Sequence, residues 1–237
     1  MSIFRDLPNP SGDSADSSPL GGQRASAYGD VFTVQIGRAA HNAADEGTYF
    51  TFNTPTPGTG IVDGVVTTYV RTTPSVVIYN GSQRRLVMDF IRFQTTVAPV
   101  GGTRVQFTTE VDNINRYTSG GTALTINNVN TDAANSALGV TGYKGVLVAP
   151  ANSASSRLHA HTIFRWGTIG IIGDVYELVF GADLPMNTNT PVATVSTFSK
   201  GVAPLVVGPG GSFVLTQWEA AQSTAPTHEV HGGFFLR

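Results

Sequence analysis

The sequence predicts an all-β protein, an antiparallel β-sandwich in which we expect jelly-roll strand order, preceded by an extended N-terminal arm. Short runs rich in β-branched and aromatic residues recur between clusters of Gly, Pro and Asn, which is the strand-and-turn pattern of a sandwich or barrel. Helix patterns are scarce, and no repeat of fixed period indicates a propeller or solenoid. Many antiparallel strands with long Gly-rich connections favour the jelly-roll, and an immunoglobulin-like sandwich is the second choice.

The first thirty residues differ in composition from the rest of the chain. They are rich in Pro, Gly, Ser and Asp and carry almost no hydrophobic periodicity, which is typical of an unpacked segment. We therefore expect residues 1–30 to form the arm and residues 31–237 to form one domain, because β-sandwiches commonly occupy this length. The arm residues expected to contact a partner are Ile3, Phe4, Leu7 and Pro8.

The expected strands are runs of Val, Ile, Thr, Phe and Tyr bounded by turn residues. In chain order they lie at residues 31–36, 48–53, 61–70, 75–80, 86–97, 103–112, 122–127, 144–149, 158–166, 175–180, 192–198, 204–207, 212–219 and 228–236.

Residues 104–111 show the clearest alternation of these runs. Val105 and Phe107 share one face, and Gln106 and Thr108 share the other. We expect the first face to be buried and the second to meet solvent or a partner.

Residues 86–93 break the alternation, because Met88 and Phe90 oppose Ile91 and Phe93 across the pleat. A strand that is apolar on both faces is expected at the centre of a sheet, or covered on both sides.

Two segments are candidate helices. Thr131 and Asp132 could cap a turn or two through residues 133–138, which Gly139 would stop in a left-handed conformation. Residues 38–46 are the other candidate, and they could equally form a loop.

Asn80 and Gly81 carry two overlapping signals. With Ser82 they match the glycosylation sequon, but an Asn-Gly pair between two strand patterns is first of all a hairpin signal. We therefore expect a hairpin that joins the strands 75–80 and 86–97.

The charge content limits the classes of partner. Charged residues make up 13% of the chain, against roughly 25% in ordinary soluble domains, a profile common in proteins that work packed against neighbours. A net charge of −2 gives no general attraction for phosphate backbones, so no nucleic-acid partner is expected. The densest basic group, Arg84, Arg85 and Arg92, is expected to form a solvated turn and ion pairs.

Two absences in the sequence exclude further classes. Without cysteine the chain has neither disulfides nor thiolate metal sites. No segment approaches the ~20 apolar residues that span a bilayer, and the N-terminus lacks a signal-peptide pattern, so no membrane partner is expected.

His159-Ala160-His161 is the sharpest local motif, since alternate residues of a strand point the same way and can both reach one metal. The motif invites comparison with the cupins, whose pattern continues with a Glu that this sequence lacks at the corresponding position. His228 and His231 are three residues apart and would face opposite ways on a regular strand. The preferred interpretation is that His159 and His161 make hydrogen bonds from a polar strand face. We therefore expect no metal, and the two histidines remain candidate ligands only for the alternative of a metal site.

Other chemistry finds little support. Residues 127–132 concentrate Asn and Asp oxygens that could bind Ca²⁺, but they lack EF-hand spacing and are ordinary turn residues. There is no Gly-x-Ser-x-Gly elbow, and no pair of carboxylates is singled out for glycoside hydrolysis. We therefore expect no catalytic residues, no cofactor and no enzymatic activity. The aromatic residues that could stack on a sugar are Tyr117, Tyr143 and Trp166.

The last thirty residues have a familiar arrangement. A Gly-Pro-Gly-Gly-Ser sequence at 208–212 leads into the strand Phe213-Val214-Leu215-Thr216-Gln217-Trp218-Glu219, and a Ser/Ala/Pro linker precedes the closing aromatic run at 232–237. This arrangement resembles the ends of small β-rich virion proteins of tailed bacteriophages, most of all capsid cement or head decoration proteins. The resemblance implies a jelly-roll on the capsid exterior that bridges capsomers and resists internal DNA pressure, with no chemistry required.

Three functional hypotheses follow. The first is a non-enzymatic virion structural protein of the cement or decoration type, whose partners are the major capsid protein and copies of itself in a dimer or trimer. A jelly-roll shell protein of another virus class is a variant of it. The second is a receptor- or glycan-binding module of a tail or a secreted protein. The third is a metal-dependent jelly-roll enzyme that uses His159 and His161.

Overall fold

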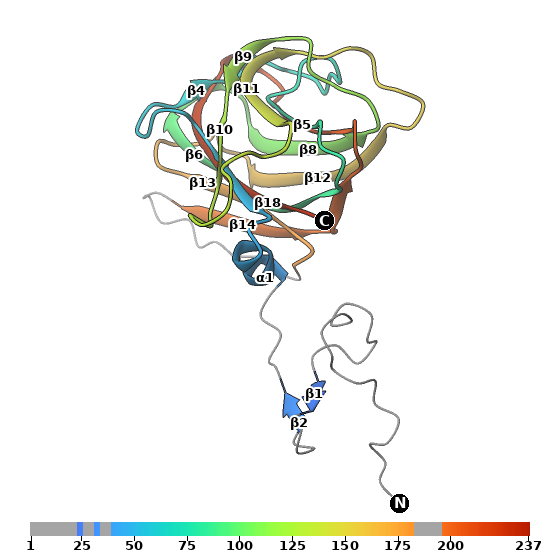
Figure 1. Ribbon diagram of the computed structural model, residues 1–237. Coiled ribbons are helices and arrows are strands. Elements are labelled where there is room, and N and C mark those ends of the chain that lie inside the picture. The colour runs from blue at the N-terminus through green and yellow to red at the C-terminus, as the bar shows by residue number, and fades with distance from the viewer. Residues whose placement is uncertain (1–22, 26–30, 34–38, 183–195) are drawn as a thin grey trace, which may run out of the picture. The chain divides into compact units, whose positions relative to one another are not determined.

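The computed structural model describes residues 23–25, 31–33, 39–182 and 196–237, and the chain divides into two units, Met1–Asn42 and Ala43–Arg237 (Figure 1). In the first unit, β1 (Gln23–Ala25) and β2 (Val31–Thr33) form an antiparallel pair. The predicted partner-contact residues Ile3, Phe4, Leu7 and Pro8 lie outside the described residues, so their role stays a prediction.

Two sheets face each other in the second unit. The first, named the β18 sheet, has the order β10-β3-β18-β6-β13-β14, and the second, named the β16 sheet, has the order β12-β8-β16-β5-β11-β9. All pairs on these two paths are antiparallel except β13 with β14. The antiparallel β-sandwich predicted from the sequence is therefore confirmed.

The strand bounds are as follows. The β18 sheet contains β3 (Tyr49–Asn53), β6 (Leu86–Val97), β10 (Thr125–Asn128), β13 (Val175–Phe180), β14 (Thr197–Val202) and β18 (Thr227–Leu236), with β4 (Ile61–Val62) on β18 and β15 (Leu205–Val207) on β6. The β16 sheet contains β5 (Val76–Asn80), β8 (Arg104–Asp112), β9 (Ser119–Ala123), β11 (Val140–Val148), β12 (Arg157–Trp166) and β16 (Ser212–Trp218). A small separate pair joins β7 (Val100–Gly101) to β17 (Gln222–Thr224).

The strand order is that of a jelly-roll. The eight strands β3, β5, β6, β8, β12, β13, β16 and β18 are numbered one to eight along the chain. Their order is 1-8-3-6 in the β18 sheet and 2-7-4-5 in the β16 sheet. Two interleaved Greek keys produce this order. The connection from β8 to β12 contains three additional strands. Of these, β10 extends the β18 sheet beyond β3, and β11 and β9 extend the β16 sheet beyond β5.

Aromatic side chains from both sheets fill the core. Phe93 of the β18 sheet stacks on Phe107 of the β16 sheet with ring centroids 4.8 Å apart, and Phe180 meets Phe213 edge to face at 5.8 Å. Such contacts add to the free energy that apolar burial already contributes. The core therefore joins the two layers directly.

A β-bulge explains the broken alternation of β6. Its register against β18 shifts between Met88 and Phe90, so Asp89 is the extra residue. Met88, Ile91 and Phe93 are consequently all buried, while Phe90 is half-buried on the outer face. The central position predicted for this strand is confirmed, since β6 lies between β18 and β13.

The predicted strand at 61–70 is wrong beyond Val62. Asp63 points between the two sheets, and the chain from there to Ser75 instead lies over the outer face of the β16 sheet, where Glu219 N–H donates to Val66 O at 2.8 Å. Gln106 and Thr108 of β8 are therefore buried, and the expectation that this polar face meets solvent or a partner is wrong as well.

Two local predictions fail and one holds. Residues 133–138 form turns rather than a helix, and Leu138 has a φ of 52°. Asn80 and Gly81 do not make a hairpin, because β5 and β6 belong to different sheets. The buried Asn80 amide instead donates to the carbonyls of Arg84 and Val207, and these hydrogen bonds hold the connection from β5 to β6, where the chain passes from one sheet to the other. The candidate helix at 38–46 is confirmed as α1 (Ala39–Asp45).

Candidate functional site

The two histidines of the His-x-His motif do not face one point. The register between β12 and β8 shifts between Leu158 and Ala160, which makes His159 the extra residue of a bulge. His159 Nδ1 lies 3.1 Å from Thr109 Oγ1, whereas His161 Nδ1 lies 3.0 Å from Thr108 Oγ1. Because adjacent residues of a strand point to opposite faces, the two imidazoles lie on opposite sides of the sheet.

The surroundings of each ring agree with this separation. On the side of β12 that faces the core, His159 contacts Phe180 and the carbonyl of Ala203. On the outer face, His161 stacks on Trp218. The premise that the motif presents both rings to one metal is therefore wrong. Within residues 39–182 and 196–237, no three His, Asp or Glu side chains gather closely enough to hold a metal ion.

His228 and His231 face opposite ways, as their spacing predicts. His231 Nδ1 lies 2.5 Å from Asn53 Oδ1, and the ring packs on Phe90 at the outer face of the β18 sheet. His228 points into the core and contacts the rings of Phe93 and Tyr176 edge-on.

His228 belongs to a buried ionic cluster that the sequence did not indicate. Asp63 accepts from Lys144 Nζ at 2.5 Å and lies 2.6 Å from His228 Nδ1. All three side chains are at most 1% exposed. Burial lowers the pKa of His228 and of Lys144. Although burial alone would raise the pKa of Asp63, the charge of Lys144 and the hydrogen bond with His228 hold it below its ordinary value. The cluster connects the two sheets inside the sandwich.

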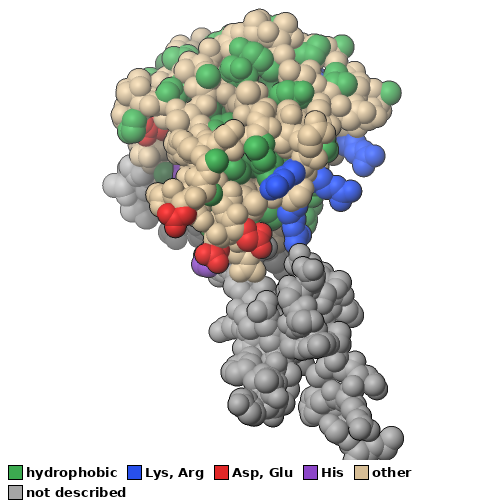
Figure 2. Space-filling view, viewed as in Figure 1, with side chains coloured by type: hydrophobic (Ala, Val, Ile, Leu, Met, Phe, Trp, Pro, Cys, Tyr) green, Lys and Arg blue, Asp and Glu red, His purple; other side chains and the backbone are tan. Residues whose placement is uncertain are grey.

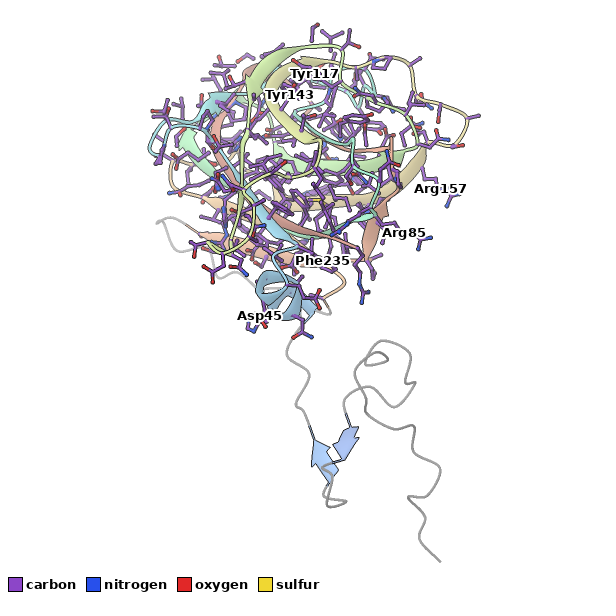
Figure 3. The ribbon with its side chains drawn as sticks, in the orientation of Figure 1. Asp45, Arg85, Tyr117, Tyr143, Arg157 and Phe235 are labelled. Carbon is purple, nitrogen blue, oxygen red and sulfur yellow. The ribbon has the colours of Figure 1, made fainter. Side chains whose placement is uncertain are left out.

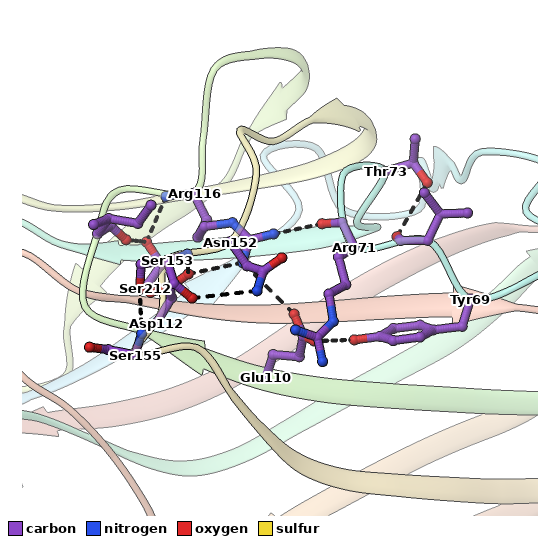
Figure 4. A network of polar contacts seen from close by, with 12 residues as sticks. Tyr69, Arg71, Thr73, Glu110, Asp112, Arg116, Asn152, Ser153, Ser155 and Ser212 are labelled. Atoms are coloured by element: carbon purple, nitrogen blue, oxygen red, sulfur yellow. Dashed lines mark hydrogen bonds and ion pairs between the residues drawn. The ribbon is translucent and has the colours of Figure 1, made fainter.

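A second polar network lies under the 63–75 segment (Figure 4). Arg116 is fully buried, and its guanidinium contacts Asp112 at 3.1 Å and donates to the carbonyl of Arg71 at 2.7 Å. Glu110 accepts from the Tyr69 hydroxyl and pairs with Arg71 Nε at 2.9 Å. These contacts fasten the covering segment to the sheet, so they account for the buried charges structurally.

The backbone and hydroxyl of Ser153 complete the second network. Both donate to the Asp112 carboxylate, and the backbone N–H is 3.0 Å away. Although burial alone would raise the pKa of Asp112, these hydrogen bonds and Arg116 hold it below its ordinary value. The network therefore also anchors the loop that precedes β12.

The aromatic residues proposed as sugar platforms lie in two places. Tyr117 and Tyr143 come together on the outer face of the β16 sheet and stack with ring centroids 3.6 Å apart (Figure 3). Each ring thus covers one face of the other. Trp166 is separate, is 67% exposed, and carries the Arg104 guanidinium 3.8 Å from its ring centroid.

Trp166 is part of an apolar end of the sandwich. Four large apolar side chains are between 51% and 67% exposed where β6 and β12 end and β8 and β13 begin. Hydrogen bonds from Gly167 N–H to Thr103 O and from Gly173 N–H to Thr95 O hold the contributing segments together. We call this surface the Trp166 end, and it consists of Val97, Val100, Trp166 and Ile172.

An open groove lies at another edge. It has a volume of approximately 480 Å³ and is lined mainly by Thr, Gly and aliphatic residues of the 54–62 segment, β9 and β11. The lining contains no charged side chain and no aromatic ring, so the groove offers no catalytic group.

The Asn-rich turn at 127–132 uses its amides locally. Asn128 Oδ1 accepts from Asn130 N–H, Asn130 Oδ1 accepts from Asp132 N–H, and Asn127 Oδ1 accepts from Asn135 Nδ2. Turn formation therefore accounts for this composition.

Comparison with known proteins identifies no relative. No protein-family model, curated protein or solved structure matches the chain. Among the described residues, no helix has the length and hydropathy needed to cross a membrane.

Proposed function

We propose that the chain is a non-enzymatic structural protein of a bacteriophage particle, of the capsid cement or decoration type. It binds the outer surface of the capsid and stabilises the head by bridging capsomers. The observation that carries this proposal is the Trp166 end, where a tryptophan and three aliphatic side chains are exposed together. The jelly-roll fold is compatible with this role, because viral capsid proteins use it, but lectins and enzymes use it too.

The Trp166 end has the properties of a binding surface. Tryptophan is enriched among the residues that dominate binding energy, and clustered exposed apolar area marks interaction sites on otherwise polar proteins. Each contact with the major capsid protein need only be modest, since many copies act together once the shell fixes their geometry.

The test measures binding to particles that lack the chain. Purified protein is added to such particles, and occupancy is read by quantitative gel analysis and electron microscopy. We expect saturable binding, and a reduction of at least about tenfold in affinity for Trp166→Ala, in line with the ~2 kcal/mol typical of a dominant interface residue. Val206→Ala is the matched control, because Val206 is 50% exposed outside the Trp166 end. Absence of binding by the unmodified protein would contradict the proposal.

The arm is assigned a supporting role in the same proposal. Removing residues 1–30 is expected to lower capsid occupancy while the sandwich stays folded, because an extended segment can add contact area along a neighbour. Unchanged occupancy after this deletion would remove the arm from the mechanism and leave the Trp166 end in place.

A receptor- or glycan-binding module is the second candidate, and the exposed Trp166 ring is what favours it. Sugars stack on such rings, although Arg104 already covers one face here. A glycan array distinguishes the two functions: saturable binding to a glycan that Trp166→Ala abolishes, without binding to particles, would favour the second.

A further inference from the structure

Four exposed arginines lie together at the end of the sandwich opposite the Trp166 end. Arg84 and Arg85 precede β6, Arg157 begins β12, and Arg237 follows β18. Arg85 and Arg237 exchange backbone hydrogen bonds of 2.8 and 2.9 Å. Within the described part of the chain none of the four forms an ion pair. Figure 3 shows Arg85 and Arg157 projecting from one side of the molecule, and Figure 2 shows Lys and Arg side chains gathered on that side.

Exposed carboxylates lie on a neighbouring part of the same end. Asp45 is the last residue of α1 and Glu46 follows it, and Asp132 is held nearby because Asn130 Nδ2 donates to Asp45 O at 3.0 Å. Leu236 N–H donates to Thr48 O at 3.0 Å, which places this acidic cluster within a few residues of Arg237. In Figure 3, Phe235 lies between Asp45 and Arg85. The two clusters are therefore neighbours but are not paired with each other.

A turn region with one exposed apolar side chain near each end connects the two clusters. The turn region 129–139 begins beside Tyr49, where Val129 N–H donates to Tyr49 O, and it ends where Gly139 packs against Gly81. Val129 is 43% exposed and Leu138 is 51% exposed along it. Leu138 also holds a left-handed backbone with φ at 52°, which is unfavourable for a residue with a branched side chain.

We propose that this end of the sandwich binds a second copy of the chain about a two-fold axis, with the acidic cluster of each copy against the arginine cluster of the other. In such an interface the same patch serves both copies, so adjacent clusters of opposite sign complement themselves when one copy is rotated by 180°. Val129 and Leu138 then meet their counterparts near the axis. The charges set the orientation, and Val129 and Leu138 supply apolar area for burial.

The inference deepens the proposed function by naming the surface through which the protein associates with itself. It uses the end of the sandwich that capsid binding leaves free. Its test measures the mass of the isolated protein. The dimer can therefore be disproved while capsid binding through the Trp166 end stands, and capsid binding can be disproved while the dimer stands.

The experiment is size-exclusion chromatography with light scattering on the full chain at low and high salt. We expect twice the 24.9 kDa of one chain at low salt, falling toward one chain at about 0.5 M NaCl, where screening shortens the reach of exposed charges. R84E/R85E and D45K/E46K should each give the mass of one chain. An equimolar mixture of these two variants should restore the doubled mass, because each variant carries the charge that the other requires.

The controls separate this interface from a general effect of net charge. R84Q/R85Q and T56E/T59E change the net charge equally, but Thr56 and Thr59 lie on the exposed 55–59 segment away from the charged end. We expect the doubled mass to be lost only in R84Q/R85Q. A single-chain mass for the unmodified protein at low salt would overturn the proposal. So would a trimer, or a dimer that withstands both charge reversals.

Discussion

At the scale of single residues, the chain places several ionised groups where water does not reach. Asp63 and Lys144 form one such pair between the sheets, with the imidazole of His228 beside them, and Arg116 is buried under the 63–75 segment. Buried charges are strongly destabilising when one partner is removed, because the remaining charge loses both water and its counterion. These residues are therefore expected to be sensitive positions although none of them is assigned a chemical role.

Replacing Asp63 by Asn tests the first cluster. Lys144 would remain buried without its counterion and His228 without its carboxylate partner, and we expect the free energy of unfolding to fall by about 3–5 kcal/mol, measured by urea denaturation. The exposed pair of Arg92 and Glu177, at 2.7 Å, provides the comparison: Arg92→Ala should cost at most about 1 kcal/mol. Equal losses in the two variants would contradict this account.

The histidines make stability depend on pH. Burial lowers the pKa of His228, and burial together with Arg92 lowers the pKa of His231. Below the ordinary value of about 6.5 the unfolded chain then binds more protons than the native protein, so stability is fully present above that pH and falls as the pH decreases. The loss should reach about 1.4 kcal/mol per pH unit for each histidine.

Denaturation at a series of pH values between 7 and about 4.5 measures this slope. His231→Gln should make it shallower without disturbing the buried cluster, since His231 lies on the other face of β18. A slope unchanged in His231→Gln would exclude this residue as a source. Asp63, whose pKa is lowered, adds a further loss only at pH values below about 3.9, its ordinary value.

At the scale of elements, the packing of β18 depends on a position without a side chain, Gly232. Gly232 faces the ring of Phe52, and a Cβ at this position would lie 2.1 Å from the ring. The aromatic ring fills the space that a side chain on β18 would otherwise occupy. The strand consequently packs closely against β3 on one side and β6 on the other.

Gly232→Ala is therefore expected to destabilise the sandwich by about 1–3 kcal/mol through overpacking, as read from the shift of the urea midpoint. Gly208→Ala is the matched control, because a Cβ there meets nothing within 4 Å and the backbone is not left-handed. That variant should be neutral or slightly stabilising, since alanine restricts the unfolded chain. A neutral Gly232→Ala would show that Phe52 moves aside without cost.

Element prediction from sequence succeeded where local pattern and tertiary burial agree. The bounds of β6 and β13 match the expected runs, and β16 and β18 match within a residue. The run expected at 122–127 was wrong as one strand, because Leu124 separates β9 from β10, which belong to different sheets. The alternation of residue types along a strand does not indicate where the chain passes from one sheet to the other.

The misplaced histidine motif has a similar cause. Alternation predicts a shared face only on a regular strand, and the bulge at His159 reverses the facing of the residues that follow, up to a second register shift between Ile163 and Arg165. Bulges depend on the partner strand, so His159-Ala160-His161 contains no local signal for one. The buried Asp63 cluster could not be found for a related reason, since its members come from three distant segments.

At the scale of the whole molecule, the described core belongs entirely to the second unit. Its buried apolar cluster extends from Phe50 to Leu236. We expect removal of residues 1–30 to leave the thermal midpoint of the sandwich within a few degrees of its original value, as measured by calorimetry. A large decrease in the thermal midpoint would show that the arm stabilises the sandwich itself, in addition to any contact that it makes with a partner.

The position of β18 has a consequence for folding during synthesis. β18 lies between β3 and β6, and Thr54 and Val230, which share hydrogen bonds across this junction, are 176 positions apart. β18 is also the last of the described strands to leave the ribosome. Until then β3 and β6 have no central neighbour, and their open edges can pair with other nascent chains. The β18 sheet therefore stays incomplete for nearly the whole time that the sandwich is being translated.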